Sequence, residues 1–310
     1  MPPKNNVHPN WTKRACPICG SLNFKTKSAF YANKPAEQMD WNDVKSYFIG
    51  LRNDQIFFSY FRCIDCGLLY CPWYFNTEQI ANLYAAMPDN TMGEDKSTIS
   101  RTQSSYARWI MKNGISNNRY LEVGPDIGLV AKEILKINPP KHVTFLEPNQ
   151  SVRQELLTNV SSIKSIEIID FLAGMQETNF DLVTGIHVYD HLINPLEDLR
   201  QLRKKVPLGG HLAIVVHNEK SVLRNFLQKK WPPFCLQHPQ LFNPKTLENI
   251  LRESGWGLEA VGRTTNWYHL QHFVKMGAGV LGLPAGLSRL TPNIEVPIRL
   301  GNIITLSKAI

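Results

Sequence analysis

The chain has 310 residues, of which 43% are hydrophobic and 19% are charged, and its formal net charge is +8 at pH 7. This length and apolar content favour one large domain with a sizeable core and a smaller second domain. The amino terminus contains no apolar segment of the signal-peptide type, and the longest uncharged stretch near the other end, residues 276–288, is too short and glycine-rich to span a bilayer. We therefore expect a soluble, cytoplasmic protein.

Four cysteines near the amino terminus form two CxxC pairs, Cys16 with Cys19 and Cys63 with Cys66, and each pair is followed by a glycine. Two intervening residues allow both sulfurs of a pair to face one metal, and two pairs complete a closed tetrahedral set of four thiolates. In a cytoplasmic protein such cysteines indicate a metal site or free thiols rather than disulfides. We predict a structural zinc ion, with iron as the minor alternative, in a small zinc-ribbon-like domain over residues 1–80.

A zinc site of this kind reduces the apparent basicity of the chain. Four thiolates and one Zn²⁺ contribute −4 + 2 = −2, so the formal charge of +8 becomes +6. The remaining excess is spread along the chain, with local clusters at residues 200–205 and 224–230. Basic clusters on helices are more often solvated faces than nucleic-acid sites, so we do not expect nucleic-acid binding.

Aromatic residues dominate the stretch that leads to the second cysteine pair. Residues 55–61, Gln-Ile-Phe-Phe-Ser-Tyr-Phe, predict a strand, and Cys71 beyond it is expected to be a small buried residue. A short helix is predicted over residues 77–85, with Thr77 as its N-cap.

A linker over residues 81–115 is expected to join the two domains. Its polar loop, residues 87–97, marks the boundary, and residues 101–112 predict a helix that leads into the second domain. That domain is expected to occupy residues 116–310.

The most informative segment of the chain, from Tyr120 to Gly128, lies at the start of this second domain. An apolar strand runs into a glycine-bearing turn, the turn opens a helix over residues 129–135, and a second apolar strand over residues 143–146 ends at Glu147. This is the layout of a nucleoside-binding βαβ unit, in which an acid takes the ribose hydroxyls. Two classes of cofactor use it, dinucleotides and S-adenosylmethionine.

The pattern of glycines argues against a dinucleotide. That cofactor needs G-x-G-x-x-G, whereas this turn has no third glycine at position 129 and carries Asp126 where a diphosphate would sit. The segment resembles the first motif of class I S-adenosylmethionine-dependent methyltransferases, acid-x-Gly-x-Gly-x-Gly, with Asp126 in place of the central glycine. The resemblance implies an α/β fold with a seven-stranded Rossmann-like sheet. It also implies a cofactor site formed by Glu122, Gly124, Asp126, Gly128 and Glu147.

The next two strands extend the same resemblance. A third strand is expected to end at Asp170, where the family often holds the adenine amino group, with Phe171 as a stacking face. The fourth strand, residues 180–186, is followed by His187, and ligands of open α/β sheets bind beyond the carboxyl ends of the strands. Residues 187–195 resemble the family's H-V-L-E-H-L-x-D-P segment, so His187 is also expected to contact the cofactor.

The rest of the sheet is predicted from apolar runs and helix-stop signals. These give a helix over residues 196–205, a strand over 211–217, a helix that begins with Asn243 and Pro244 and ends at Gly255, and strands over 258–264 and 302–307.

Two insertions, residues 219–242 and 267–300, interrupt this sheet and are interpreted as walls of the acceptor site, with decorative or dimer-forming insertions as the alternative. The apolar stretch 273–287 could touch a membrane or a lipid carrier, although buried packing is favoured.

Methyl transfer from a sulfonium is an in-line displacement, so the protein mainly aligns the two reactants and, where needed, removes a proton. Four histidines are candidate bases, since imidazole titrates near working pH: His187, His191, His217 and His238. Residues 237–242 resemble the E-H-x-x-x-F segment of sugar C-methyltransferases, whose histidine acts as base. On that resemblance we predict His238 as a catalytic residue, and we add His187 because it lies closer to the expected position of the methyl group.

The amino-terminal cysteine module resembles the zinc-binding domain that precedes certain methyltransferases, including sugar C-methyltransferases, in which a helix with a tyrosine, here Tyr84, follows. The resemblance implies methyl transfer to a small molecule, most of all a nucleotide- or lipid-linked sugar of polysaccharide or glycolipid synthesis. Two alternatives stay open: an rRNA methyltransferase with a zinc module, and a non-catalytic scaffold, which Asp126 motivates. The sequence leaves the oligomeric state undetermined.

Overall fold

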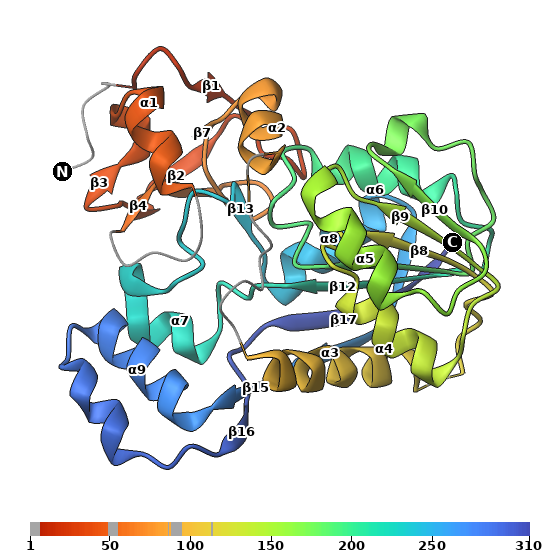
Figure 1. Cartoon of the computed structure of the whole chain (residues 1–310). Helices are drawn as coiled ribbons and strands as arrows, with labels where there is room; N and C mark the ends of the chain where they lie inside the picture. Colours follow the sequence, from red (N-terminus) through yellow and green to blue (C-terminus); the bar gives the residue numbers. More distant parts are fainter. Residues whose placement is uncertain (1–6, 49–54, 86, 88–94, 113) are drawn as a thin grey trace.

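The computed structural model describes residues 7–48, 55–85, 87, 95–112 and 114–310 of the chain. Figure 1 shows a large sheet covered by helices, a smaller amino-terminal part beside it, and a lobe that carries the helices labelled α7 and α9.

The large sheet has seven strands in the order β10-β9-β8-β11-β12-β17-β14, and β17 runs antiparallel to both of its neighbours. Apolar runs form the central strands because both faces of a parallel sheet are covered. The strand order reverses between β8 and β11, and ligands of such sheets bind at that switch point. The strands are β8 (Arg119–Val123), β9 (His142–Leu146), β10 (Ile166–Ile169), β11 (Leu182–Ile186), β12 (His211–Val216), β14 (Trp256–Arg263) and β17 (Ile303–Ala309).

Helices cover both faces of this sheet. Alternating strand residues divide between the two sides, so that Tyr120 packs in one hydrophobic cluster and Leu121 in the other. The first cluster includes residues of α3 (Lys96–Met111), α4 (Leu129–Ile137) and α5 (Arg153–Asn159). The second includes residues of α6 (Pro195–Arg203) and α8 (Pro244–Glu253). Short 3₁₀ turns precede α5 and follow β10, at η3 (Gln150–Val152) and η4 (Leu172–Gly174).

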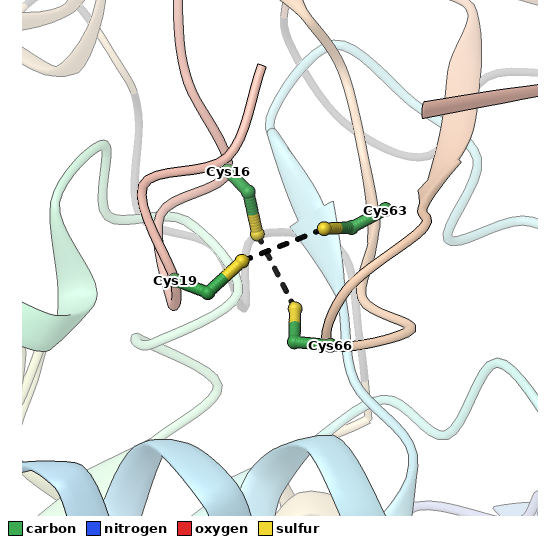
Figure 2. Close-up of side chains that lie close together, drawn as sticks. All are labelled: Cys16, Cys19, Cys63 and Cys66. Atoms are coloured by element: carbon green, nitrogen blue, oxygen red, sulfur yellow. Dashed lines mark hydrogen bonds between the residues drawn. The ribbon is translucent and has the colours of Figure 1, made fainter. Parts of the chain in front are cut away.

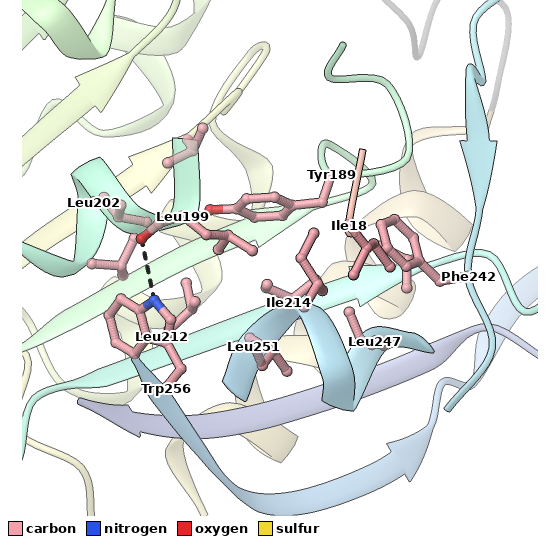
Figure 3. Close-up of a cluster of buried hydrophobic side chains, with 14 of the residues drawn as sticks. Ile18, Tyr189, Leu199, Leu202, Leu212, Ile214, Phe242, Leu247, Leu251 and Trp256 are labelled. Carbon is pink, nitrogen blue, oxygen red and sulfur yellow. Dashed lines mark hydrogen bonds between the residues drawn. The ribbon is translucent and has the colours of Figure 1, made fainter. Parts of the chain in front are cut away.

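Helix α8 begins as its sequence predicts. The side chain of Asn243 accepts hydrogen bonds from the backbone N–H groups of Lys245 and Thr246, and Pro244 occupies the first turn. The second cluster, drawn in part in Figure 3, also takes in Ile18 from the first cysteine pair. The amino-terminal part therefore packs into the core of the large one.

The amino-terminal part contains a four-stranded sheet in the order β13-β6-β5-β2. Its strands are β2 (Phe24–Phe30), β5 (Tyr60–Cys63), β6 (Leu69–Tyr70) and β13 (Gln240–Leu241). Strand β13 comes from the insertion at residues 219–242, which thus completes a sheet that the amino terminus begins. Around this sheet lie β1 (Thr12–Lys13) paired with β7 (Trp73–Tyr74), β3 (Lys34–Pro35) paired with β4 (Ile56–Phe57), and the helices α1 (Trp41–Val44), α2 (Thr77–Ala85), η1 (Ala36–Gln38) and η2 (Lys45–Tyr47).

Two details of this region differ from the sequence predictions, and a third expectation is not tested. The aromatic strand over residues 55–61 is broken in two, because β4 and β5 join different sheets. The N-cap of α2 is Asn76, whose side chain accepts from the backbone N–H of Gln79, and Thr77 is the first helical residue. Most of the expected boundary loop, residues 87–97, lies outside the described residues.

Parts of the two insertions form the lobe of Figure 1. The first adds α7 (Val222–Leu227) and η5 (Gln228–Lys230), and the second adds β15 (Asn266–His269), α9 (Leu270–Leu281), η6 (Ala285–Leu290) and β16 (Glu295–Ile298). The preference for buried packing of residues 273–287 is wrong: Met276, Leu281, Leu283 and Leu287 are 40–49% exposed. No helix in the described parts of the chain is long and apolar enough to cross a bilayer.

Candidate functional site

The four cysteines of the two CxxC pairs converge on one point, as Figure 2 shows. The Sγ atoms of Cys16 and Cys66 lie 3.4 Å apart, those of Cys19 and Cys63 lie 3.5 Å apart, and all four lie within 4.8 Å of one another. A zinc ion with Zn–S bonds of about 2.3 Å in a tetrahedron separates neighbouring sulfurs by about 3.8 Å. The donor set and its spacing therefore fit a closed four-thiolate zinc site.

The glycine turn after β8 sits against the segment that follows β11. Gly124 has φ 62°, and a Cβ built on it would lie 2.7 Å from Cγ2 of Val188. Gly128 has φ 75° and would clash in the same way with Leu156. Both positions therefore require glycine, and the first brings the predicted cofactor turn into contact with the histidine segment.

Glu147 is placed at the end of β9 to face this turn. One carboxylate oxygen accepts from the backbone N–H of Asp126 at 3.0 Å, and the other accepts from that of Asn149 at 2.8 Å. Each oxygen keeps a further lone pair, which is what a carboxylate needs to accept from ribose hydroxyls. Asp126 itself has φ 54°, a left-handed conformation that aspartate tolerates better than most residues.

Glu122 lies beneath the turn and is 2% exposed. Burial raises the pKa of its carboxyl group to about 8, and nearby Glu147 also raises this pKa. Hydrogen bonds from the Tyr120 hydroxyl and the backbone of Ala131 act in the opposite direction and lower the pKa. Glu122 is therefore largely protonated at neutral pH in the protein without ligand.

The residues predicted to hold the adenine lie at the carboxyl end of β10. The carboxylate of Asp170 pairs with Arg153 and accepts from Gln150, and the ring of Phe171 is 63% exposed. The structure thus places them on the same edge of the sheet as Glu147, whose backbone carbonyl also accepts from Arg153.

Four histidines gather at the carboxyl ends of β11 and β12. The ring centroids of His187 and His217 are 4.6 Å apart, those of His217 and His238 are 4.8 Å apart, and those of His238 and His191 are 4.6 Å apart. His187 and His191 follow β11, His217 follows β12, and His238 comes from the first insertion. All four histidines named as candidate bases from sequence are thus brought together.

Hydrogen bonds fix the orientation of His238, which is 2% exposed. Its Nδ1 lies 2.7 Å from the carbonyl of Pro233, which can only accept, so this nitrogen carries a proton. Its Nε2 lies 3.0 Å from Nε2 of His191, whose Nδ1 lies 2.9 Å from the hydroxyl of Tyr84. The three side chains form one hydrogen-bonded chain, in which His238 is the innermost member.

The pKa values of the paired histidines are shifted in opposite directions. Burial lowers the pKa of His191 to about 3. Burial also lowers the pKa of His238, but Cys235, Asp190 and the Pro233 carbonyl together raise it above the ordinary imidazole value. A proton that enters this pair therefore resides on His238.

The amino-terminal part holds the segment that carries His238. The hydroxyl of Tyr60 donates to the His238 carbonyl at 2.6 Å, and the hydroxyl of Tyr74 donates to the Leu236 carbonyl. Arg62 forms an ion pair with Glu219, which is 1% exposed, at the start of the same insertion. The cysteine module and the histidine cluster are thus two ends of one packed unit.

Sequence reasoning missed Asp190, which links the cluster. Its Oδ2 lies 2.5 Å from Nδ1 of His217 and accepts from the backbone N–H of the same residue. Asp190 occupies the glutamate position of the H-V-L-E-H-L-x-D-P segment that residues 187–195 resemble, and that resemblance assigned it no role. The register that brings β12 beside β11, with Ile186 opposite Val215, is what places His217 near it.

Comparison with known proteins extends these observations. The model of a family described as methyltransferase domain matches residues 99–261, which is more than half of the chain. No curated protein matches the chain in sequence.

Among solved structures, the complex between the Haloferax volcanii Trm112 methyltransferase activator and a methyltransferase contains a similar chain. It is 12% identical, with a TM-score of 0.50, over 74% of this chain and 97% of that one.

Two further structures are similar at lower scores. The N-methyltransferase NodS from Bradyrhizobium japonicum, in complex with S-adenosylhomocysteine, is 14% identical over 76% of this chain and 98% of that one, with a TM-score of 0.48. Magnesium protoporphyrin IX methyltransferase from Synechocystis, also with bound S-adenosylhomocysteine, is 12% identical over 76% and 88%, with a TM-score of 0.45. The chain belongs to the methyltransferase domain family, and its mixed seven-stranded sheet has the α/β methyltransferase fold.

Proposed function

We propose that the protein transfers a methyl group from S-adenosylmethionine to a small-molecule acceptor, and that this acceptor is a nucleotide- or lipid-linked sugar. One observation carries the proposal: the contact between Gly124 and Val188 joins the predicted cofactor turn to the histidine segment. S-adenosylmethionine held by Glu147 through its ribose would thus have its sulfonium group near a cluster of polar side chains at the switch point of the sheet.

The reaction breaks the sulfur–methyl bond, whose electron pair stays on sulfur, and forms a bond from the methyl carbon to the acceptor. The acceptor loses a proton, and the chain from Tyr84 through His191 to His238 takes it when His238 is neutral, a form that its raised pKa favours only at alkaline pH. His191, whose side chain is 22% exposed, is the member open to an acceptor. Buried His238 acts through it, and we assign the second catalytic role to His187, whose ring centroid lies 4.6 Å from that of His217.

A sugar acceptor suits the polar character of this site. Imidazole nitrogens and the Tyr84 hydroxyl can each pair with a hydroxyl group, and such pairing gives strong discrimination between acceptors. The likeness of residues 237–242 to the sugar C-methyltransferase segment points the same way. Zinc at the four cysteines would hold the amino-terminal part together, with no open position for a reactant.

The test is a panel of nucleotide sugars incubated with the protein and S-adenosylmethionine labelled in its methyl group. We expect label in at least one sugar, with turnover reduced about 100-fold or more in His238→Asn, in line with the contribution of general bases. His272→Asn, which changes an exposed histidine of α9, is the matched control and should retain full turnover. Absence of transfer to every sugar, together with salt-dependent transfer to rRNA, would move the acceptor to RNA.

A further inference from the structure

Asp190 is fully buried, and half of its carboxylate has no partner. Its side chain has 0% exposure, and Oδ2 is occupied by His217. Oδ1 accepts no hydrogen bond from any side chain or backbone group of the described residues. A buried carboxylate oxygen is costly to leave unpaired, so this position favours a bound cation or donor.

Two histidines lie beside this carboxylate, and one of them has a nitrogen without a partner among the described residues. Nδ1 of His187 is buried and also lacks a partner among the described residues. One ligand atom from each of His187, Asp190 and His217 lies within 4.8 Å of the other two. His191 and His238 lie near the same carboxylate, but their nitrogens are already engaged by Tyr84, Pro233 and each other.

Histidine is the commonest metal ligand among protein side chains. Neutral imidazole is the form that coordinates a metal ion. Two histidines and one carboxylate form the facial triad found in sites that keep open positions for other ligands.

Two other groupings of this kind in the described chain each hold a carboxylate that is paired with an arginine. Glu295 beside His269 pairs with Arg101, and Glu177 beside His142 pairs with Arg119. An arginine at the carboxylate competes with a cation there. Asp190, by contrast, has no arginine or lysine partner among the described residues.

We propose that His187, Asp190 and His217 bind a divalent transition-metal ion at the acceptor end of the site, separate from the four-cysteine zinc. Oδ1 of Asp190 and one nitrogen of each histidine are its ligands. The remaining positions take oxygen atoms of the acceptor, and two neighbouring sugar oxygens fit such open positions. The role in acceptor binding rests on the proposed function, whereas the binding of the ion does not.

The experiment is a Co²⁺ titration of the full-length protein after the four-cysteine site has been filled with one equivalent of Zn²⁺, followed by visible absorption. We expect one further equivalent to bind with the weak bands of nitrogen and oxygen ligands and without a thiolate-to-metal band. Co²⁺ affinity should fall more than about tenfold in His187→Asn and in His217→Asn, because each loses one of three protein ligands. His272→Asn is the control and should bind as the wild type does.

Three results would overturn the inference. These are no saturable Co²⁺ binding by the zinc-filled protein, a thiolate-to-metal band that shows exchange at the cysteines, or equal affinity in all four proteins.

Asp190 is left intact because it also accepts from the backbone of His217, so its loss would affect folding. Circular dichroism and thermal unfolding confirm that the histidine variants fold. Co²⁺ binding without methyl transfer would count against the proposed function alone, and transfer without Co²⁺ binding would count against this inference alone.

Discussion

Asp126 stands where similar methyltransferases have a glycine, and its backbone explains how the chain accommodates it. At φ 54° the residue keeps the left-handed turn, and its N–H donates to Glu147. Aspartate is among the few non-glycine residues that adopt this conformation readily. The substitution thus preserves the turn that the proposed cofactor site needs.

We expect Asp126→Gly to bind S-adenosylmethionine at least as tightly as the wild type, since glycine suits the same conformation. Asp126→Val should be less stable than Asp126→Gly by about 1–2 kcal/mol, because a β-branched residue is strained at positive φ. Thermal unfolding and calorimetric titration of both variants measure these effects. Equal stability of the two would show that the turn changes shape in solution.

Glu122 makes stability depend on pH. Its folded-state pKa, about 8, lies above that of an unfolded glutamate, so its contribution is fully present below the unfolded value and is lost as pH rises through 8. Raising the pH from 5 to 8 should therefore destabilise the wild type by about 1–3 kcal/mol relative to Glu122→Gln, which stays neutral.

Urea unfolding of the wild type and Glu122→Gln at several pH values provides the measurement. Glu155→Gln, at an exposed position of α5, is the control and should follow the wild type. Parallel pH curves for the wild type and Glu122→Gln would contradict the raised pKa.

At the scale of elements, strand β13 connects the cysteine module to the histidine cluster. Leu241 pairs with Leu69 and Gln240 with Tyr70, so the chain just after His238 is held as the edge of the amino-terminal sheet. The hydroxyl of Tyr60 fixes the preceding turn through the carbonyls of His238 and Cys235.

Tyr60→Phe should therefore lower methyl transfer about tenfold or more while leaving S-adenosylmethionine binding unchanged, because it frees the segment that positions His238. The lost hydrogen bonds should also cost about 1–2 kcal/mol of stability. Tyr31→Phe is the matched control, since the Tyr31 hydroxyl has no hydrogen-bond partner among the described residues. The measurement compares the turnover and the cofactor affinity of Tyr60→Phe and Tyr31→Phe. Equal turnover in both variants would show that the amino-terminal part does not position His238 for the reaction.

The sequence predicted most elements of the large sheet, because each combines an apolar run with a turn or capping signal. Helix α8 shows why: Asn243, Pro244 and Gly255 mark both ends locally. Strand β13 could not be predicted, since its two residues are a strand only through pairing with β6, about 170 positions away. Asp190 was missed for the same reason: its importance depends on the register between two strands.

At the scale of the whole molecule, the amino-terminal part packs against the large one on the side that we propose for the acceptor. Cys16, Ile18 and Cys63 belong to the same hydrophobic cluster as residues of α6 and α8. The proposed cofactor side, from Glu122 to Glu147, contains none of the cysteines.

Removal of zinc by a strong chelator should therefore abolish methyl transfer and leave S-adenosylmethionine affinity within about threefold of its original value. Re-addition of Zn²⁺ should restore transfer. Metal analysis, calorimetry and labelled transfer on the same samples measure this. Full transfer by protein shown to lack metal would contradict the supporting role.

The central claim is that the turn from Glu122 to Gly128 and the carboxylate of Glu147 bind S-adenosylmethionine, and calorimetric titration tests it most directly. We predict saturable binding by the wild type. The affinity should be at least about tenfold weaker in Glu147→Ala, because this variant loses the acceptor of the ribose hydroxyls. The affinity of Glu155→Ala should equal that of the wild type. Absence of binding at millimolar cofactor, or equal affinity in Glu147→Ala and the wild type, would contradict the account.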